Sequence, residues 1–152
     1  MAKIARKVWV RGLCAAAILS VAGVAAVAQQ DVLKTRQADM KANGEALKTI
    51  DGIIKAGGNP QDVVAPANKI AETAALIPSL FPAGSDQGDT GANKEIWDKF
   101  DDFKTKASNL ENEAKMLAAA GQAGDLATVR AQFDKVVQAC GDCHKPYRHK
   151  RQ

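Results

Sequence analysis

Apolar side chains recur at steps of three and four residues through most of this sequence, and no long stretch alternates polar and apolar residues. Steps of three and four bring side chains to one face of an α-helix, whereas a half-buried β-strand needs alternation. The pattern therefore predicts an all-α protein. Its clearest stripe comprises Ile96, Phe100, Phe103, Ala107, Leu110, Ala114 and Leu117.

Glycine and proline residues divide this pattern into four helical segments. The segments are predicted to begin near Asp31, Val63, Asn93 and Leu126, with Asp125 as the N-cap of the last. The first three are predicted to end at residues 57–60, at Pro78, and at Gly121 and Gly124. Residues 80–92 are rich in Gly and Pro and predict a long loop. Mostly short links and heptad-like spacing favour an antiparallel four-helix bundle.

The composition agrees with a single helical domain. A chain of 152 residues has the size of one domain. Its hydrophobic content of 46% and charged content of 25% are ordinary for globular proteins and argue against general disorder. Aromatic residues make up only 5%, so we expect helices packed through small and aliphatic side chains rather than a sandwich or barrel.

Residues 1–28 have the features of a bacterial secretory signal. Four basic residues and no acidic residue precede residue 12, residues 12–27 are almost wholly apolar or small, and Ala26-Val27-Ala28 forms an A-x-A cleavage site. The apolar run is shorter than the ~20 residues that span a bilayer. We therefore expect cleavage after Ala28, which also removes Cys14, and a mature periplasmic domain of residues 29–152 with no membrane segment.

Removal of the signal changes the charge of the protein. The full chain has 21 Lys and Arg against 17 Asp and Glu, and the signal holds the whole excess. The mature chain is formally neutral, so no nucleic-acid partner is predicted. The basic residues near the C-terminus are either a solvated helix end or a surface that orients an acidic redox partner protein.

Residues 140–144 carry the chemistry of this sequence. They form C-x-x-C-H, the motif through which haem c is attached. Cys140 and Cys143 share a helix face, so both thiols can add to the two vinyl groups of one haem. His144 lies on the same face, where its imidazole can bind the iron as an axial ligand. One covalently bound haem c, with its iron, is therefore the predicted cofactor.

Other interpretations of these cysteines are weaker. A thioredoxin-like redox pair needs a preceding strand, and the sequence has no strand pattern. A structural zinc site would lack a second pair of ligands, and a disulfide between Cys140 and Cys143 would close a small, strained loop. A non-haem structural or metal-binding bundle remains the competing class. No general acid–base pair or activated nucleophile is apparent, so no enzyme activity is predicted.

Taken together, these features resemble a class II c-type cytochrome, of the cytochrome c′ family. The signal, the four helices, a C-x-x-C-H motif close to the C-terminus and the following Tyr147-Arg148 all match that family. Residues 81–86 with 95–97, and Arg36-Gln37 on the first helix, match it too. The resemblance covers residues 31–148. It implies one haem in a four-helix bundle, and a homodimer is common in the family.

The resemblance also implies roles for particular residues. Cys140 and Cys143 would hold the haem, and His144 would be the proximal ligand. Arg36 and Gln37 match a pair that contacts the haem propionates, and an arginine suits a carboxylate. Asp89 in the loop matches an acidic position that contacts the haem, and Arg148 matches a basic residue near the proximal face.

One residue departs from the family pattern. Pro146 removes a backbone N–H from the last turn of the fourth predicted helix. The sequence therefore leaves open whether this helix ends just after His144, and where Tyr147 and Arg148 lie.

Met40 separates two functions within the family, because it matches the position over the distal side of the iron. In one branch the residue there only blocks the site, and five-coordinate, high-spin iron takes up NO or CO. In the other branch a Met binds the iron and gives a six-coordinate, low-spin electron carrier. We expect single-electron transfer with Met40 as a ligand, and NO or CO binding is the alternative. Two other side chains are rivals of Met40 as ligands. Met116 lies off the apolar stripe of its helix, and His149 is expected to be solvated, so neither is favoured.

Overall fold

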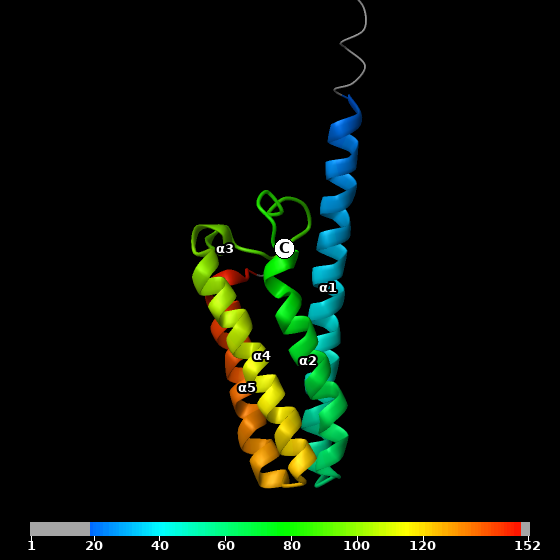
Figure 1. Cartoon of the computed structure of the whole chain (residues 1–152), viewed down its shortest axis with the longest axis vertical. Helices are drawn as coiled ribbons and strands as arrows, with labels where there is room; N and C mark the ends of the chain where they lie inside the picture. The colour runs from blue at the N-terminus through cyan, green and yellow to red at the C-terminus, as the bar shows by residue number, and fades with distance from the viewer. Residues whose placement is uncertain (1–18, 150–152) are drawn as a thin grey trace, which may run out of the picture.

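The computed structural model describes residues 19–149, with side chains from residue 30 onward. Within this range the chain is helical and has no β-strand. Figure 1 shows the four long helices α1, α2, α4 and α5 side by side, each antiparallel to the next, which confirms the predicted bundle. The elements are α1 (Leu19–Ala56), the 3₁₀ helix η1 (Pro60–Val63), α2 (Val64–Leu76), the 3₁₀ helix η2 (Ile77–Leu80), α3 (Glu95–Asp98), α4 (Phe100–Ala123) and α5 (Leu126–Tyr147).

Helix α1 begins at Leu19, well before the start predicted near Asp31. The residues between them contain several alanines and no proline, so nothing in them ends a helix. The N-terminal part of α1 extends beyond the other helices (Figure 1). The predicted cleavage site after Ala28 lies within this part, and residues 1–18 of the predicted signal lie outside the described residues. Cleavage there would leave the bundle portion of α1 in place.

Helix caps define the turns at one end of the bundle. Gly57 (φ 62°) and Gly124 (φ 78°) adopt left-handed backbone where α1 and α4 end, a conformation that favours glycine. The side chain of Asp125 accepts hydrogen bonds from the backbone N–H groups of Ala127 and Thr128 at 3.0 and 3.3 Å. The predicted N-cap of the last helix is therefore present.

The third predicted helix is divided in two. Lys99 (φ −126°, ψ 43°) interrupts it, so the single turn of α3 precedes α4. Trp97 on α3 donates from Nε1 to the carbonyl oxygens of Phe81 and Pro82 at 3.2 and 2.9 Å. This contact ties α3 to the loop that follows η2. A tertiary contact of this kind leaves no sign in the periodicity of the sequence.

The prediction that Gly121 ends the third helix is wrong, because α4 continues through it to Ala123. A Cβ atom at Gly121 would lie 2.9 Å from the carbonyl oxygen of Pro60 and 3.1 Å from Cγ2 of Val64. Glycine is needed there for the close approach of α4 to η1 and α2. Helix α5 likewise continues through Pro146 to Tyr147, which answers the question that the sequence left open.

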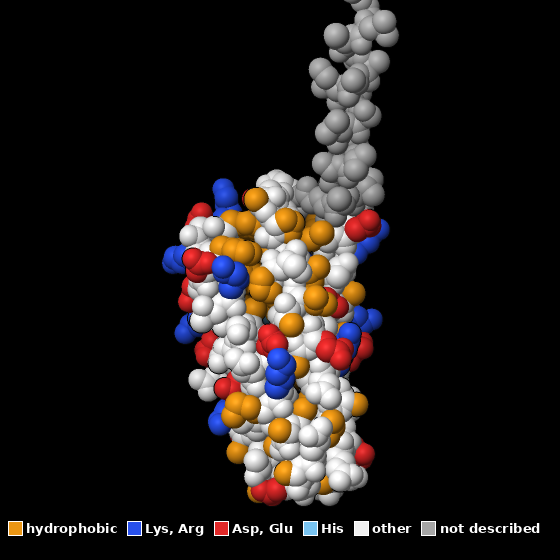
Figure 2. All heavy atoms as spheres, in the orientation of Figure 1, with side chains coloured by type: hydrophobic (Ala, Val, Ile, Leu, Met, Phe, Trp, Pro, Cys, Tyr) orange, Lys and Arg blue, Asp and Glu red, His pale blue; other side chains and the backbone are white. Residues whose placement is uncertain are grey.

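The bundle is filled at one end and hollow at the other. Ile50, Val63, Leu117 and Val129 are fully buried near the end where α1 leads into η1 and α4 into α5. Near the loop that joins η2 to α3, the helices instead surround a cavity. On the face shown in Figure 2, acidic and basic side chains are interspersed.

Replacing Gly121 with Ala should lower the free energy of unfolding by about 1–3 kcal/mol, since the new methyl group would overlap the backbone of Pro60. Gly52→Ala is the matched control, because Gly52 is an exposed glycine of α1 with nothing within 4 Å of its added Cβ. That change should raise stability by about 0.5–1 kcal/mol. Urea denaturation measures both, and equal effects at the two sites would contradict the packing argument.

Candidate functional site

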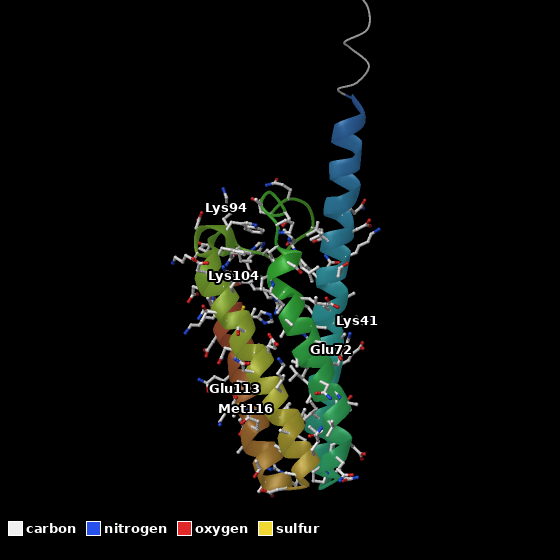
Figure 3. All side chains as sticks on the ribbon, in the orientation of Figure 1. Lys41, Glu72, Lys94, Lys104, Glu113 and Met116 are labelled. Carbon is white, nitrogen blue, oxygen red and sulfur yellow. The ribbon has the colours of Figure 1, made fainter. Side chains whose placement is uncertain are left out.

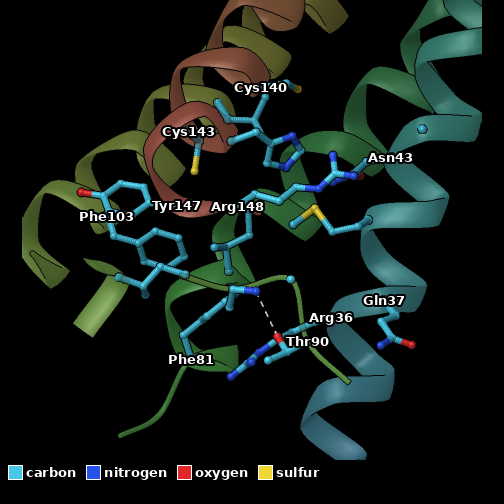
Figure 4. A pocket seen from close by; sticks show the side chains of 18 of the residues that line it. Arg36, Gln37, Asn43, Phe81, Thr90, Phe103, Cys140, Cys143, Tyr147 and Arg148 are labelled. Atoms are coloured by element: carbon cyan, nitrogen blue, oxygen red, sulfur yellow. Dashed lines mark hydrogen bonds between the residues drawn. The ribbon is translucent and has the colours of Figure 1, made fainter. Parts of the chain in front are cut away.

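A cavity of about 570 Å³ lies between α1 and α5, at the end of the bundle that carries the loop. This volume is within the usual range for a small-molecule or cofactor site. Figure 4 shows the cavity from close by. Its lining comes from α1, η2, the loop, α3, α4 and α5, and includes Leu33, Arg36, Gln37, Met40, Asn43, Leu47, Ile77, Phe81, Thr90, Ala92, Ile96, Phe103, Leu110, Cys140, Cys143, His144, Tyr147, Arg148 and His149.

The last turns of α5 bring the three motif residues into this cavity. Cys140, Cys143 and His144 all line it, and all three side chains are partly buried. Both thiols are free. The i, i+3, i+4 spacing on a continuous helix places them on one face, as the sequence predicts.

Burial shifts the titration of these groups. It raises the pKa of the Cys140 thiol and raises the pKa of the Cys143 thiol to about 11, so both thiols stay protonated at neutral pH. Burial also lowers the pKa of the His144 imidazole, and the positive charge of Arg148 lowers it further. The neutral imidazole that results is the form that binds a metal.

Met40 lines the same cavity from α1, the helix that borders it opposite the motif. The two rival ligands differ from it. Met116 lies on the outer side of α4 and is 51% exposed (Figure 3). His149 is exposed at the rim of the cavity, where its Nδ1 lies 2.8 Å from Oδ1 of Asn93.

Arg36 has a structural role that the sequence did not reveal. Its guanidinium group is buried, donates to the carbonyl oxygens of Leu80 and Ser85 and to Oγ of Ser85, and lies 3.9 Å from the centre of the Phe81 ring. Burial lowers the pKa of Arg36 to about 10, which still leaves it charged at neutral pH. Charge-assisted hydrogen bonds of this kind are strong. Arg36 therefore anchors the start of the loop to α1, and it also lines the cavity.

Gln37 and Asp89 are joined by a hydrogen bond. Nε2 of Gln37 donates to the backbone carbonyl oxygen of Asp89 at 3.0 Å, and Gln37 lines the cavity. Asp89 is exposed and is not among the described residues that line it. The structure thus brings seven of the residues predicted at the site to the cavity wall, and it places Asp89 beside one of them. The seven are Arg36, Gln37, Met40, Cys140, Cys143, His144 and Arg148.

Aromatic rings form one wall of the cavity. Phe81 packs against Phe103 with ring centres 4.8 Å apart, and Phe103 packs against Tyr147 at 5.4 Å. Tyr147 is buried, and its hydroxyl donates to Oδ2 of Asp102 at 2.5 Å. Such a wall lowers the local dielectric around whatever the cavity holds. Trp97 packs against Phe81 and Phe100 against Phe103, with ring centres 6.1 and 6.0 Å apart, and Phe133 packs against the core.

The residues that follow the motif are joined to the loop beside the cavity. The backbone N–H of Asn93 donates to the carbonyl oxygen of Tyr147 at 3.0 Å, and the N–H of His149 donates to that of Gly91 at 2.9 Å. The side chain of Asn93 also donates to the carbonyl oxygen of Pro146 at 2.9 Å. We call residues 91–93 with 146–149 the clasp.

Comparison with known proteins shows the family to which this chain belongs. The family model described as Cytochrome C′ matches residues 31–148. This chain belongs to the cytochrome c′ family. A cytochrome c′ of Rhodopseudomonas palustris is 36% identical to it over 132 residues, which are 83% of this chain and 87% of that protein.

Two solved structures share the fold. Cytochrome c′ from Thermochromatium tepidum superposes with a TM-score of 0.76 at 28% identity, and covers 80% of this chain and 97% of its own. A nitric oxide complex of a variant of cytochrome c prime from Alcaligenes xylosoxidans superposes with a TM-score of 0.72 at 29% identity. The match covers 81% of this chain and 97% of that chain. The predicted family and fold are therefore confirmed.

Proteins of the cytochrome c′ family carry one covalently bound haem c with its iron, as predicted for this chain. The residues around the cavity fit that group. Two protonated thiols one helical turn apart suit two thioether bonds, and the next residue supplies an imidazole. The aromatic and aliphatic lining suits a flat, largely apolar macrocycle. In the described part of the chain, no helix has both the length and the apolar character needed to cross a membrane.

Replacing Arg36 with Leu should lower the free energy of unfolding of the holoprotein by about 2–4 kcal/mol, because buried acceptors at Leu80 and Ser85 lose a charged donor. Ser85→Ala removes the hydroxyl, which accepts from Arg36 and donates to the carbonyl oxygen of Pro82, but it keeps the backbone acceptors of Arg36 and should cost about 1–2 kcal/mol. Hydrogen exchange should also show faster opening of residues 81–85 in Arg36→Leu. Unchanged protection of that loop would argue against an anchoring role.

Proposed function

We propose that this cytochrome c′ family protein carries single electrons through its haem. Cys140 and Cys143 hold the haem, His144 is the proximal ligand, and Met40 is the distal ligand. The observation that carries this proposal is that the motif on α5 and the thioether on α1 line one cavity from different helices. Haem iron bound by His and Met accepts and returns one electron, and the thioether favours the ferrous state.

The chain's own residues support this role in three ways. His144 is kept neutral by burial and by Arg148, so that its imidazole is ready to bind iron. The wall of Phe81, Phe103 and Tyr147 keeps the surroundings apolar. Arg36 and Gln37 line the loop end of the cavity, where the positive charge of Arg36 suits the propionates even though its guanidinium group also donates to Leu80 and Ser85. The carbonyl oxygen of Asp89 positions Gln37 there.

The alternative function is binding of NO or CO at a five-coordinate iron. The nitric oxide complex of the Alcaligenes xylosoxidans protein favours it, since that protein shares the fold at 29% identity. Under this alternative Met40 only limits access to the iron. A homodimer belongs to the proposal in either case, whereas redox partner proteins belong to the electron carrier.

Absorption spectra of the purified holoprotein, with and without CO, separate the two functions. We expect sharp, split visible bands on reduction and no response to CO, because Met40 occupies the distal position. Met40→Leu should convert the iron to a high-spin form that binds CO at once. Met116→Leu is the matched control and should leave the spectra unchanged, since Met116 is exposed on α4. Immediate binding of CO by the unmodified protein would establish the gas-binding function instead.

We also propose that the protein reaches the periplasm and loses residues 1–28. Mass spectrometry of the protein from the periplasmic fraction should give an N-terminus at Gln29 and one haem that stays attached after denaturation. Ala28→Leu should block this cleavage, because the site requires a small residue. Mature protein that begins at another residue would contradict the predicted site.

A further inference from the structure

One polar side chain faces the cavity without a role in the proposed site. Asn43 on α1 lines the cavity and is only 6% exposed. Its Oδ1 lies 2.6 Å from Oγ1 of Thr73 on α2, which is 1% exposed. Oγ1 of Thr73 also lies 3.1 and 3.0 Å from the carbonyl oxygens of Lys69 and Ile70. The Asn43 contact is the shortest of the three and is typical of an O–H···O hydrogen bond, so we assign the single hydroxyl proton to Oδ1 of Asn43. Thr73 therefore holds the amide group in one orientation.

The amide nitrogen of Asn43 is consequently turned away from Thr73. Nδ2 has no hydrogen-bond partner among the described residues. Among these residues, every side-chain nitrogen or oxygen that solvent cannot reach has a hydrogen-bond partner, so Nδ2 is not one of the inaccessible atoms. It must therefore reach accessible space, and the space that Asn43 borders is the cavity (Figure 4). Once a cofactor fills the cavity, an amide left unpaired there would cost about 1–3 kcal/mol, which favours a partner for Nδ2 inside the cavity.

The position of Asn43 along α1 shows which part of the haem it approaches. Arg36, Met40 and Asn43 lie on successive turns of the helix face that borders the cavity. At 1.5 Å of rise per residue, Asn43 is about 10 Å further along the helix than Arg36. The amide is thus remote from the loop end, where the propionates are proposed to lie, and it is one turn beyond Met40.

We propose that Asn43 raises the reduction potential of the haem by directing its amide N–H at the distal side, with Thr73 as the positioning residue. This inference rests on the proposed location of the haem between α1 and α5. The N–H end of the amide dipole is positive and disfavours the additional positive charge of ferric iron. A hydrogen bond from Nδ2 to the sulfur of Met40 would act in the same direction, because it withdraws electron density from the ligand. Reduction adds one electron to the iron and moves no proton.

Asn43→Leu tests the dipole, because it replaces the amide with an apolar side chain of similar size. A redox titration of the holoprotein should show a roughly threefold to tenfold fall in the equilibrium constant for reduction, as expected for a peptide-sized dipole at low effective dielectric. A tenfold change is about 59 mV for a one-electron couple. If the substitution only made the surroundings of the haem less polar, the equilibrium constant for reduction would rise instead, because the ferrous state carries less positive charge. An increase, or no change, would therefore overturn the proposal.

Thr73→Val tests the orientation, because it keeps the shape of the side chain and removes the hydroxyl. The released amide can turn, so the constant should fall in the same direction as in Asn43→Leu. Added to Asn43→Leu, the Thr73 change should have no further effect on the constant. If Thr73→Val lowered the constant equally with Asn43 present and with Leu at position 43, Thr73 would act independently of Asn43, and its positioning role would be overturned. Thr73→Ser keeps the hydroxyl and should retain the potential.

Gln132→Met is the matched control for loss of a buried polar group. Gln132 on α5 is 6% exposed, donates to Glu113 and does not line the cavity. Its replacement should lower stability without changing the potential, whereas a change equal to that of Asn43→Leu would overturn the proposal.

Spectra of the same samples separate this inference from the proposed function. High-spin iron that binds CO in the unmodified protein would contradict the proposed Met40 ligand. A fall in the equilibrium constant for reduction in Asn43→Leu would still support the proposed effect of the Asn43 amide dipole. Colourless protein without covalent haem would overturn both.

Discussion

The buried guanidinium group of Arg36 holds the parts of the molecule that enclose the cavity. It joins α1 to the loop through Leu80 and Ser85, and it lies over Phe81, the first ring of the aromatic wall. Met40 and Asn43 follow Arg36 at helical spacing. The contacts of Arg36 therefore also fix the rotation of α1 that brings Met40 and Asn43 to the cavity. A buried charge whose donors are engaged is costly to disrupt, so this arrangement has few alternatives.

The two long walls of the cavity have different chemical tasks. The wall on α5 carries the groups that would bind the haem irreversibly, and their spacing within one helical turn permits little variation. The wall on α1 carries a thioether, an amide and a guanidinium group, whose replacement would leave the covalent attachment intact. With the haem held as proposed, retention of the cofactor and adjustment of its properties would fall to separate helices, and residues of α1 could change without loss of the haem.

Periodicity and the C-x-x-C-H motif predict the bundle and the α5 side of the site well, because both depend on local helical geometry. The failures have a common physical cause. The break at Lys99 accompanies the contact of Trp97 with the loop, and Gly121 is needed for its approach to Pro60. Neither contact is local in sequence. Asn43 was missed for a related reason. The role of an amide on a helix can be inferred only when its hydrogen-bond partner is known, and that partner, Thr73, lies on another helix.

The clasp joins residues near the C-terminus to the loop between η2 and α3. A chain emerges from its N-terminal end, so α1, α2 and α4 are available to associate before residues 146–149 exist as a partner for residues 91–93. The clasp can form only once residues 146–149 have joined the chain. Until then the loop beside the cavity lacks these contacts, and the last turns of α5 that lead into the clasp carry the two thiols and the imidazole.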